Sequence, residues 1–364
     1  MTTARTEQAA LAHHGDVDAR GARLDLAVNV AVPEPPAFVA EAIGREVARL
    51  SAYPDPASAN AALAEDLGVP AECLLLTNGS AEAFQLVARL RRWRRPVVVE
   101  PQFTEPGLEL VAAGAAPAWH ALDEGTGWTL DAALLGDRHP DADLVVVGNP
   151  TNPTSRLHPR AELLGLVDPA TTPDDRVLLV DEAFLDVSTD PAQTVVAEAV
   201  ADRPGERAVL VTGSLTKTYG LAGVRAGCLV GPAPLVALLA ERQVHWSVNS
   251  LALAAVLAVC TPQGRAFREA QRERLGRNAA HLAATLRELG LRVPVDPDGP
   301  FVLAHHPHAE QLRERLRDEH GIAVRRADTF RGLDPTWIRI AARDPEQVAE
   351  LADGIRTILQ EPRP

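Results

Sequence analysis

Lysine is almost absent from this sequence. Its 364 residues include 36 lysines and arginines together, and only one of these, Lys217, is a lysine. An arginine guanidinium does not lose its proton in a protein, whereas a lysine amine can be desolvated, deprotonated and used as a nucleophile toward a carbonyl. Lys217 is therefore a candidate for Schiff-base chemistry, and a surface lysine retained by chance is the alternative.

The sequence also has less positive than negative charge, no long apolar run and few cysteines, and these features limit the classes of protein to which it can belong. The net charge of −13 disfavours nucleic acid as a partner, because a phosphate backbone attracts the opposite sign. The N-terminus lacks the apolar core of an export signal, and the longest apolar run, 251–260, is too short to cross a bilayer, so we expect no membrane partner. The three cysteines, Cys73, Cys228 and Cys260, lack metal-ligand spacing and fit a reduced, cytoplasmic setting as small buried hydrophobes, so no metal is expected.

Several short runs are apolar throughout rather than alternating. They lie at residues 97–100, 143–150, 176–184 and 208–214. Continuous Val and Leu runs separated by helix-length segments are typical of strands buried on both faces. These runs predict an α/β fold with a mostly parallel sheet and helices packed on each side.

The pattern changes from about residue 262. A long Arg/Glu/Ala-rich segment has helical periodicity and ends at Gly290, and short strands with one further helix follow it. This arrangement is typical of a smaller α+β unit. We expect an N-terminal arm at 1–45 that joins the small domain, a three-layer αβα large domain at 46–245 and a small C-terminal α+β domain at 246–364.

Polar residues follow the ends of the predicted strands. Asn152 lies after the second run, Asp181 ends the third, and Ser214 and Lys217 follow the fourth. Ligands of parallel α/β sheets sit beyond the carboxyl ends of the strands. We therefore expect these four residues at one site.

The segment GSAEAF at 79–84 predicts a phosphate site. It follows an apolar run and opens a helix, so the backbone N–H groups of Gly79, Ser80 and Ala81 can face an anion. Arg225, in a glycine-rich turn, can add a bidentate contact to the same phosphate. A plain serine N-cap and an ordinary surface arginine are the alternatives.

Together these residue types match pyridoxal 5′-phosphate. Its aldehyde requires an amine, its phosphate requires N–H groups, a hydroxyl and a guanidinium, its ring nitrogen requires a carboxylate and its 3′-oxygen requires an amide. The sequence offers Lys217 for the aldehyde, Ser214 and Arg225 for the phosphate beside residues 79–81, Asp181 for the ring nitrogen and Asn152 for the oxygen.

The cofactor ring makes two further demands. A buried carboxylate at Asp181 needs a cation or a donor beside it, and there it would keep the ring nitrogen protonated. Phe103, just past a strand end, is a candidate to stack on the ring. The alternatives are that Phe103 is simply core and that Asn152 is only a turn residue of NPTNPT.

The stretch SLTKTYGLAGVRAG at 214–227, with NPTNPT and VDEAF, resembles the fold-type I pyridoxal-phosphate enzymes of aminotransferase class I/II over nearly the whole chain. This resemblance implies that Lys217 carries the cofactor, that Ser214 and Arg225 bind its phosphate, and that Asn152 and Asp181 hold its ring. It also implies a homodimer with shared active sites, in which Tyr53 reaches the cofactor phosphate of the neighbouring subunit.

Within that family the chain is similar to the histidinol-phosphate aminotransferases and the threonine-phosphate decarboxylases of cobalamin biosynthesis. The resemblance rests on residues 13–16, 24–30, 53–56, 245–252 and 324–343. It places Arg339 at the substrate carboxylate and Arg325 at the substrate's own phosphate. The arm residues His14, Asp16 and Asn29 would orient the substrate.

Two positions depart from the pattern of the histidinol-phosphate enzymes. Phe184 stands where they usually have tyrosine, which removes one hydrogen bond to the cofactor oxygen. Ser155 stands where they usually have glycine after NPT. Both departures weaken the histidinol-phosphate assignment more than the cofactor assignment.

The resemblance implies an aminotransferase that acts on a small, phosphorylated L-amino acid. A threonine-phosphate decarboxylase-type lyase is the alternative, because Lys217 would serve as general acid/base at the substrate Cα in both reactions. The two differ in which Cα bond stands perpendicular to the ring. A cofactor-binding or regulatory protein without turnover, or a two-domain sugar- or nucleotide-binding protein, is a further alternative. Against nucleotide binding, the chain lacks the glycine spacing of a Walker A or dinucleotide motif.

Overall fold

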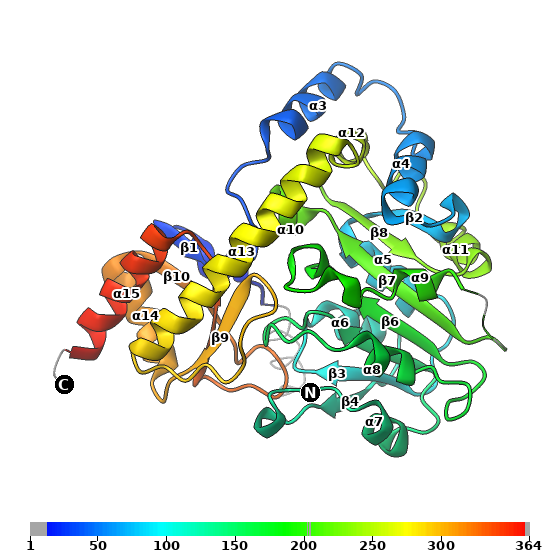
Figure 1. Ribbon diagram of the computed structural model, residues 1–364. Coiled ribbons are helices and arrows are strands. Elements are labelled where there is room, and N and C mark those ends of the chain that lie inside the picture. The colour runs from blue at the N-terminus through cyan, green and yellow to red at the C-terminus, as the bar shows by residue number, and fades with distance from the viewer. Residues whose placement is uncertain (1–12, 202, 204, 361–364) are drawn as a thin grey trace.

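The computed structural model describes residues 13–201, 203 and 205–360, so the first twelve residues of the predicted arm lie outside it. Two sheets organise these residues, one of seven strands and one of four. In Figure 1 the larger sheet and its helices lie to the right, and the smaller sheet lies to the left under the long helix α13 (Pro262–Glu288).

The larger sheet contains all four strands predicted from the apolar runs. They are β3 (Pro96–Glu100), β5 (Leu144–Gly148), β6 (Val177–Asp181) and β7 (Ala208–Ser214). The sheet has the order β2-β8-β7-β6-β5-β3-β4, and these four strands are adjacent and parallel. It is completed by β2 (Leu74–Asn78), by β8 (Ala226–Val230), which runs antiparallel to β2 and β7, and by the edge strand β4 (Ala118–Ala121). The prediction of a mostly parallel sheet is confirmed.

Alternate side chains of each central strand bury themselves on opposite faces of the larger sheet. On β5, Val145 and Val147 join one hydrophobic cluster, whereas Leu144 and Val146 join another. The first cluster includes α4 (Ala57–Leu67), α7 (Ala132–Arg138), α8 (Arg160–Gly165), α9 (Val196–Ala199) and α12 (Ser250–Val259). The second includes α5 (Gly79–Ala88), α6 (Glu105–Ala112) and α11 (Ala233–Ala240). The three-layer αβα arrangement is therefore confirmed.

The smaller unit combines the N-terminal arm with the C-terminal third of the chain. Its sheet has the order β1-β10-β11-β9, from β1 (Leu24–Leu26), β10 (Ile322–Arg326), β11 (Trp337–Ala341) and β9 (Phe301–His305). Helices α13, α14 (Ala309–His320) and α15 (Pro345–Gln360) pack their apolar side chains on it. Because β1 pairs in parallel with β10, the arm belongs to this sheet. The predicted boundaries at residues 45 and 245 stay a prediction.

The remaining elements connect the two units. In the arm, α2 (Gly15–Ala19) precedes β1, and α3 (Ala37–Val47) packs against α12, as Figure 1 shows. One-turn 3-10 helices lie at Ala71–Cys73, Glu124–Thr126, Leu185–Val187 and Pro191–Gln193. In the described part of the chain, no single helix is long and apolar enough to span a membrane. The bent pair α12 and α13, with a 79° angle, meets that test by length and composition only.

None of the three cysteines forms a disulfide. Cys73 and Cys228 are buried and Cys260 is half-buried. Burial raises the pKa of the Cys228 and Cys260 thiols to about 12. A thiol with so high a pKa is not a nucleophile at neutral pH, so these side chains serve packing.

Arg176 is a fully buried charge at the start of β6. Its guanidinium donates to the carbonyl oxygens of Ala142 (2.8 Å), Leu166 (3.3 Å), His139 (3.0 Å) and Pro140 (2.9 Å). Burial lowers the pKa of Arg176, but its ordinary value is so high that the side chain stays charged. One side chain thus satisfies loop carbonyls that the fold has taken out of water.

We expect Arg176→Ala to lower the free energy of unfolding by about 3 kcal/mol, because it leaves several buried carbonyl groups without a donor. Arg176→Lys should recover only part of the lost free energy of unfolding, since one ammonium cannot reach all four oxygens. Urea denaturation followed by circular dichroism measures the change. Arg92→Ala, at an exposed site, is the matched control and should be nearly neutral. Equal stabilities of the two alanine variants would contradict this account.

Candidate active site

A cavity of about 370 Å³ lies beyond the carboxyl ends of β6 and β7. Side chains from the arm, the larger sheet and the smaller unit meet in its wall. Among the predicted site residues it is lined by His14, Asn29, Ser80, Ala81, Phe103, Asn152, Asp181, Ser214, Lys217, Arg225, Arg325 and Arg339. The structure therefore brings together residues that lie as far apart in the sequence as His14 and Arg339, which are separated by 325 positions (339 − 14).

Lys217 lies on the one-turn helix α10 (Thr216–Tyr219), directly after β7. The helix ends at Gly220, whose φ of +68° falls in the left-handed region that glycine adopts without strain. Burial, followed by the nearby charge of Arg339, lowers the pKa of Lys217 to about 8, while Asp181 opposes the shift. Its Nζ lies 5.8 Å from the centre of the Phe184 ring. Lys217 is therefore mostly protonated at pH 7, but a larger fraction of it is a neutral amine there than for a lysine in water.

Asp181 is the last residue of β6 and faces the same cavity. Burial raises the pKa of its carboxyl to about 6, and donors to Oδ1 partly offset this shift. These donors are the Thr212 hydroxyl (3.2 Å) and the Ala183 backbone N–H (3.1 Å). Thr212 was not among the predicted site residues, and in the sequence it is only one polar residue in an apolar strand.

Two glycines shape the predicted phosphate site. A Cβ on Gly79 would lie 2.5 Å from Nη2 of Arg225, and a Cβ on Gly227 would lie 2.6 Å from the backbone nitrogen of Ser80. Only glycine at both positions lets Arg225 and β8 approach the N-terminus of α5 so closely. The first N–H groups of α5 lack intrahelical partners, so this end of the cavity can hold an anion. Gly79 itself does not line the cavity but makes room for Arg225.

The NPTNPT turn is fixed by buried polar contacts. Asn149 Oδ1 accepts from the His158 backbone N–H (2.7 Å), and Thr151 Oγ1 lies 3.1 Å from His158 Nε2. Ser155, the position where glycine was expected, has φ of +62°. Its hydroxyl accepts from the Gly299 N–H (2.8 Å), a contact that glycine could not make and that ties the turn to the segment before β9. Asn152 thereby faces the cavity.

Arg339 and Arg325 supply two buried cations on adjacent strands. Arg339 Nη1 donates to Asn152 Oδ1 (2.8 Å), and its Nη2 donates to the Ala27 carbonyl. Burial and the neighbouring Arg325 lower the pKa of Arg339, but a guanidinium stays charged at neutral pH. Arg325 lies across the strand register from Arg339. Both cavity-lining guanidinium groups are suited to carboxylate or phosphate.

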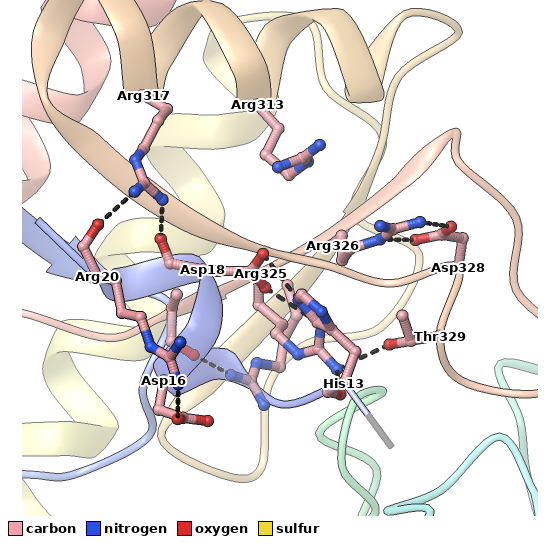
Figure 2. A network of polar contacts seen from close by, with 12 residues as sticks. His13, Asp16, Asp18, Arg20, Arg313, Arg317, Arg325, Arg326, Asp328 and Thr329 are labelled. Carbon is pink, nitrogen blue, oxygen red and sulfur yellow. Dashed lines mark hydrogen bonds and ion pairs between the residues drawn. The ribbon is translucent and has the colours of Figure 1, made fainter. Parts of the chain in front are cut away.

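Arg325 is held by the arm. Nη1 donates to Asp18 Oδ2 (3.1 Å), and Nη2 donates to Thr329 Oγ1 (2.7 Å) and to the His13 carbonyl, as Figure 2 shows. Asp18 is buried and also lies 3.1 Å from His13 Nε2. Neither Asp18 nor Thr329 was predicted. The role of Asp18 depends on a contact with Arg325, which is 307 residues away in the sequence, whereas Thr329 lies only four residues from Arg325 and carried no signal of its own.

The other predicted substrate residues form the arm side of the cavity. His14 Nε2 lies 2.6 Å from Glu105 Oε1, and its ring centre lies 5.6 Å from that of Phe103. The amide of Asn29 is buried in the cavity wall, and neither of its polar atoms has a partner within the described chain. An orphaned buried amide indicates a polar ligand. Phe330, which was missed, also lines the cavity.

Besides Gly79, which lies behind Arg225, Tyr53 is the one predicted cofactor residue that does not line this cavity. Its side chain is 76% exposed and stacks on Trp246, with ring centres 4.3 Å apart. Within its own chain Tyr53 therefore cannot contact the cavity. The prediction assigned it to a neighbouring subunit, so its position is compatible with that role.

The cavity fits pyridoxal 5′-phosphate by its donor set. The cradle formed by α5, Arg225 and the two glycines suits the phosphate, the orphaned Asn29 amide offers unused hydrogen-bonding capacity, and Asp181 and Lys217 lie in the same wall. Four cations line the cavity, Lys217, Arg225, Arg325 and Arg339, against two carboxylates, Asp16 and Asp181. Asp18 already pairs with Arg325, and an anionic ligand would offset the positive charge that remains.

Comparison with known proteins agrees with this chemistry. The model of the family described as aminotransferase class I and II matches residues 23–355. The chain is 41% identical to a histidinol-phosphate aminotransferase of Mycobacterium tuberculosis over 350 residues, which cover 95% of this chain and 91% of that protein. It is 31% identical to the threonine-phosphate decarboxylase of Salmonella typhimurium over 340 residues, which cover 92% and 91%.

Solved structures show the same fold. The histidinol-phosphate aminotransferase of Clostridium acetobutylicum superposes with a TM-score of 0.83 at 22% identity, over 92% of this chain and 98% of that one. That of Sinorhizobium meliloti, in complex with pyridoxal 5′-phosphate, superposes with a TM-score of 0.79 at 20% identity, over 91% and 90%.

The lowered pKa of Lys217 predicts its reactivity in the cofactor-free protein. Because Lys217 is the only lysine, reductive methylation with formaldehyde can be followed by mass spectrometry on a single peptide. We expect the rate to rise with pH and reach half its maximum near pH 8. Asp181→Asn removes a charge that favours the ammonium form, so it should move this midpoint to lower pH. The N-terminal amine of the same chain is the internal control, and a midpoint near that of a free lysine, about pH 10.4, would overturn the prediction.

Proposed function

Because this chain belongs to the aminotransferase class I and II family and is a pyridoxal 5′-phosphate-dependent enzyme, we propose that it transfers the amino group of a phosphorylated amino compound, as a histidinol-phosphate aminotransferase does. The observation that carries the proposal is the pair of buried arginines in one cavity with Lys217. A second substrate, an oxo acid, would bring a carboxylate for one of them.

The chain's own residues would hold the cofactor at four points. Residues 79–81, Ser214 and Arg225 would bind its phosphate, and Asp181 would face its ring nitrogen. Asn152, oriented by Arg339, would face its 3′-oxygen. When bound, the cofactor supplies an aldehyde for the amine and a ring that accepts electron density from the substrate Cα.

Lys217 would act as the acid/base. Its pKa of about 8 lets the same amine accept and donate a proton near neutral pH, which is what proton transfer at a substrate carbon requires. Phe184 would border this amine on one side, since its ring lies 5.8 Å from Nζ. Phe184 packs edge to face on Phe301, with ring centres 5.1 Å apart, so apolar side chains exclude water there.

Substrate orientation would rest with the arginines and the arm. Arg339 would bind a carboxylate and Arg325 a phosphate, and the arm residues His14, Asp16 and Asn29, which line the same cavity, would help to orient the substrate. Phe103 would pack on the cofactor ring. A threonine-phosphate decarboxylase is the second candidate, favoured by the Salmonella relative and by Phe184, and it would use the same residues with the substrate turned about Cα.

The reaction is tested by supplying histidinol phosphate and 2-oxoglutarate to the purified holoenzyme. We expect glutamate to form, and we expect Lys217→Arg to lower the rate by about a thousandfold or more, because arginine keeps the charge but cannot transfer the proton. Threonine phosphate is the discriminating control. Release of carbon dioxide from it without any oxo acid would replace the aminotransferase by the lyase, and turnover by Lys217→Arg would contradict the role of the amine.

We further propose that the enzyme is a homodimer in which Tyr53 completes the partner's active site. Tyr53 and Trp246 form an exposed stacked pair, and the apolar side chains of Val47, Leu50 and Val244 are also more than half exposed. Such apolar exposure is typical of a protein interface. The position of Tyr53 supports this proposal, because its side chain is 76% exposed and does not line the cavity of its own chain.

Subunit mixing tests the role of Tyr53. Lys217→Ala and Tyr53→Ala should each be inactive or nearly so as pure dimers. A mixed dimer would contain one intact site, with the lysine of one chain and the tyrosine of the other, so random re-association should restore about a quarter of the wild-type rate. Gel filtration checks the assembly, and Val111→Ala, exposed elsewhere, is the control. Mixtures that stay inactive would show that Tyr53 does not act across the interface.

We also propose the domain organisation and the cytoplasmic location that the sequence predicts. The arm at 1–45 would join the small domain at 246–364, and the large domain would span 46–245. Three cysteines without a disulfide support a reducing, cytoplasmic setting.

A further inference from the structure

Arginine side chains attach the N-terminal arm to the rest of the protein. They donate to main-chain carbonyl oxygens of the arm, which β1 alone cannot satisfy because it is only three residues long. The contacts are Arg325 to His13, Arg317 to Asp18 and Arg20, Arg339 to Ala27, Arg343 to Val28 and Arg274 to Ala31. Two of these arginines, Arg325 and Arg339, also line the active-site cavity.

Arg317 holds the end of α2. It lies in the last turn of α14, and its Nη1 and Nη2 donate to the carbonyl oxygens of Asp18 and Arg20, as Figure 2 shows. A helix of five residues is unstable alone, and the carbonyl groups at its C-terminal end lack intrahelical donors. Arg317 supplies these donors and adds a cation at the negative end of the helix.

The helix α2 in turn sets the position of Arg325. Asp18 on α2 is 6% exposed and accepts from Arg325 Nη1 (3.1 Å). Gly15, at the start of α2, is so close to the adjacent arm segment that an added Cβ would lie 2.5 Å from the Ala27 carbonyl oxygen. The helix therefore has little freedom at its first turn, and its last turn depends on Arg317.

We propose that Arg317 is a positioning residue for the substrate's anionic group. It acts through α2 and Asp18 on the guanidinium of Arg325, and it does not line the cavity itself. This inference rests on the proposed function, because it takes Arg325 as the site that binds the substrate phosphate. Without Arg317, α2 would fray, Asp18 would lose its fixed place, and Arg325 would no longer be held in one orientation.

The matched control lies on the same helix. Arg313 is one turn before Arg317 on α14, and its ion pair is with Glu314 (3.3 Å). Arg313→Ala and Arg317→Ala remove the same charge at nearly the same place, so long-range attraction of an anionic substrate changes equally. Any difference between the two variants reports on the contact with α2.

Steady-state kinetics with histidinol phosphate give the first measurement. We expect Arg317→Ala to raise KM about tenfold with kcat within about twofold, since the lost contact orients the bound anion and not the reacting atoms. Arg317→Lys should recover part of the loss. The cofactor absorbance should match the wild type, which separates this effect from general damage to the fold. An Arg317→Ala enzyme with the kinetics of Arg313→Ala would overturn the inference.

A double variant tests whether Arg317 acts on Arg325 through Asp18. If Arg317 acts through Asp18, then Arg317→Ala added to Asp18→Asn should change KM much less than it does in the wild type, because contacts in one network are not additive. Fully additive effects would show that Arg317 acts by another path. Should Arg317→Ala fail to fold, Arg317→Lys provides the same comparison.

Binding of inorganic phosphate distinguishes this inference from the proposed function. In the holoenzyme the cofactor fills its own phosphate cradle, so added phosphate should raise Tm through Arg325. We expect a smaller rise for Arg317→Ala than for Arg313→Ala, whichever phosphorylated compound is the substrate. If the wild type is stabilised but does not turn over histidinol phosphate, the proposed function fails alone. If Arg317→Ala is stabilised as fully as Arg313→Ala, or the wild type is not stabilised, the inference on Arg317 fails.

Discussion

A desolvated amine among buried guanidinium groups is the constraint on which the site depends. Burial and the charge of Arg339 lower the pKa of Lys217, and Asp181 alone among the main contributors raises it. The resulting pKa of about 8 suits proton transfer near neutral pH. In water, or in a close ion pair with a carboxylate, the pKa of the amine would be higher. The same burial raises the pKa of Asp181 to about 6, so both groups titrate near neutrality.

The fold places these groups beyond the carboxyl ends of neighbouring strands. The carboxyl ends of β5, β6 and β7 present Asn152, Asp181 and Lys217 on consecutive neighbouring strands. A chain with a net charge of −13 can still build a cationic cavity, because the field of a cleft is set by the residues that line it. The excess of cations destabilises the cavity until an anion enters, so binding and stability are coupled.

The sequence predicted the fold and the site where a residue type indicates a single structural role. Unbroken apolar runs predicted β3, β5, β6 and β7, because a strand buried on both faces of a sheet is apolar throughout. The polar residues after these runs predicted the wall of the site, because the carboxyl ends of parallel strands lie at one edge of the sheet. Asp18, Thr212, Arg317 and Phe330 carried no such signal. Their contacts join separate segments through side-chain directions, and spacing along one chain does not encode these. Ser155 shows a third case, in which a departure from the family pattern is explained only by its φ of +62° and its bond to Gly299.

The preference for arginine has a structural consequence of its own. A planar guanidinium can donate to several carbonyl oxygens at once, as Arg176 does to four and Arg317 to two. In the part of the arm that the structure describes, from residue 13 on, the strand β1 is three residues long, so the arm depends on such contacts for its place at the cavity. An ammonium would satisfy fewer acceptors and would be more strongly hydrated. Arginine therefore suits the contacts that build the cavity, and lysine suits the one position inside it where a proton must leave.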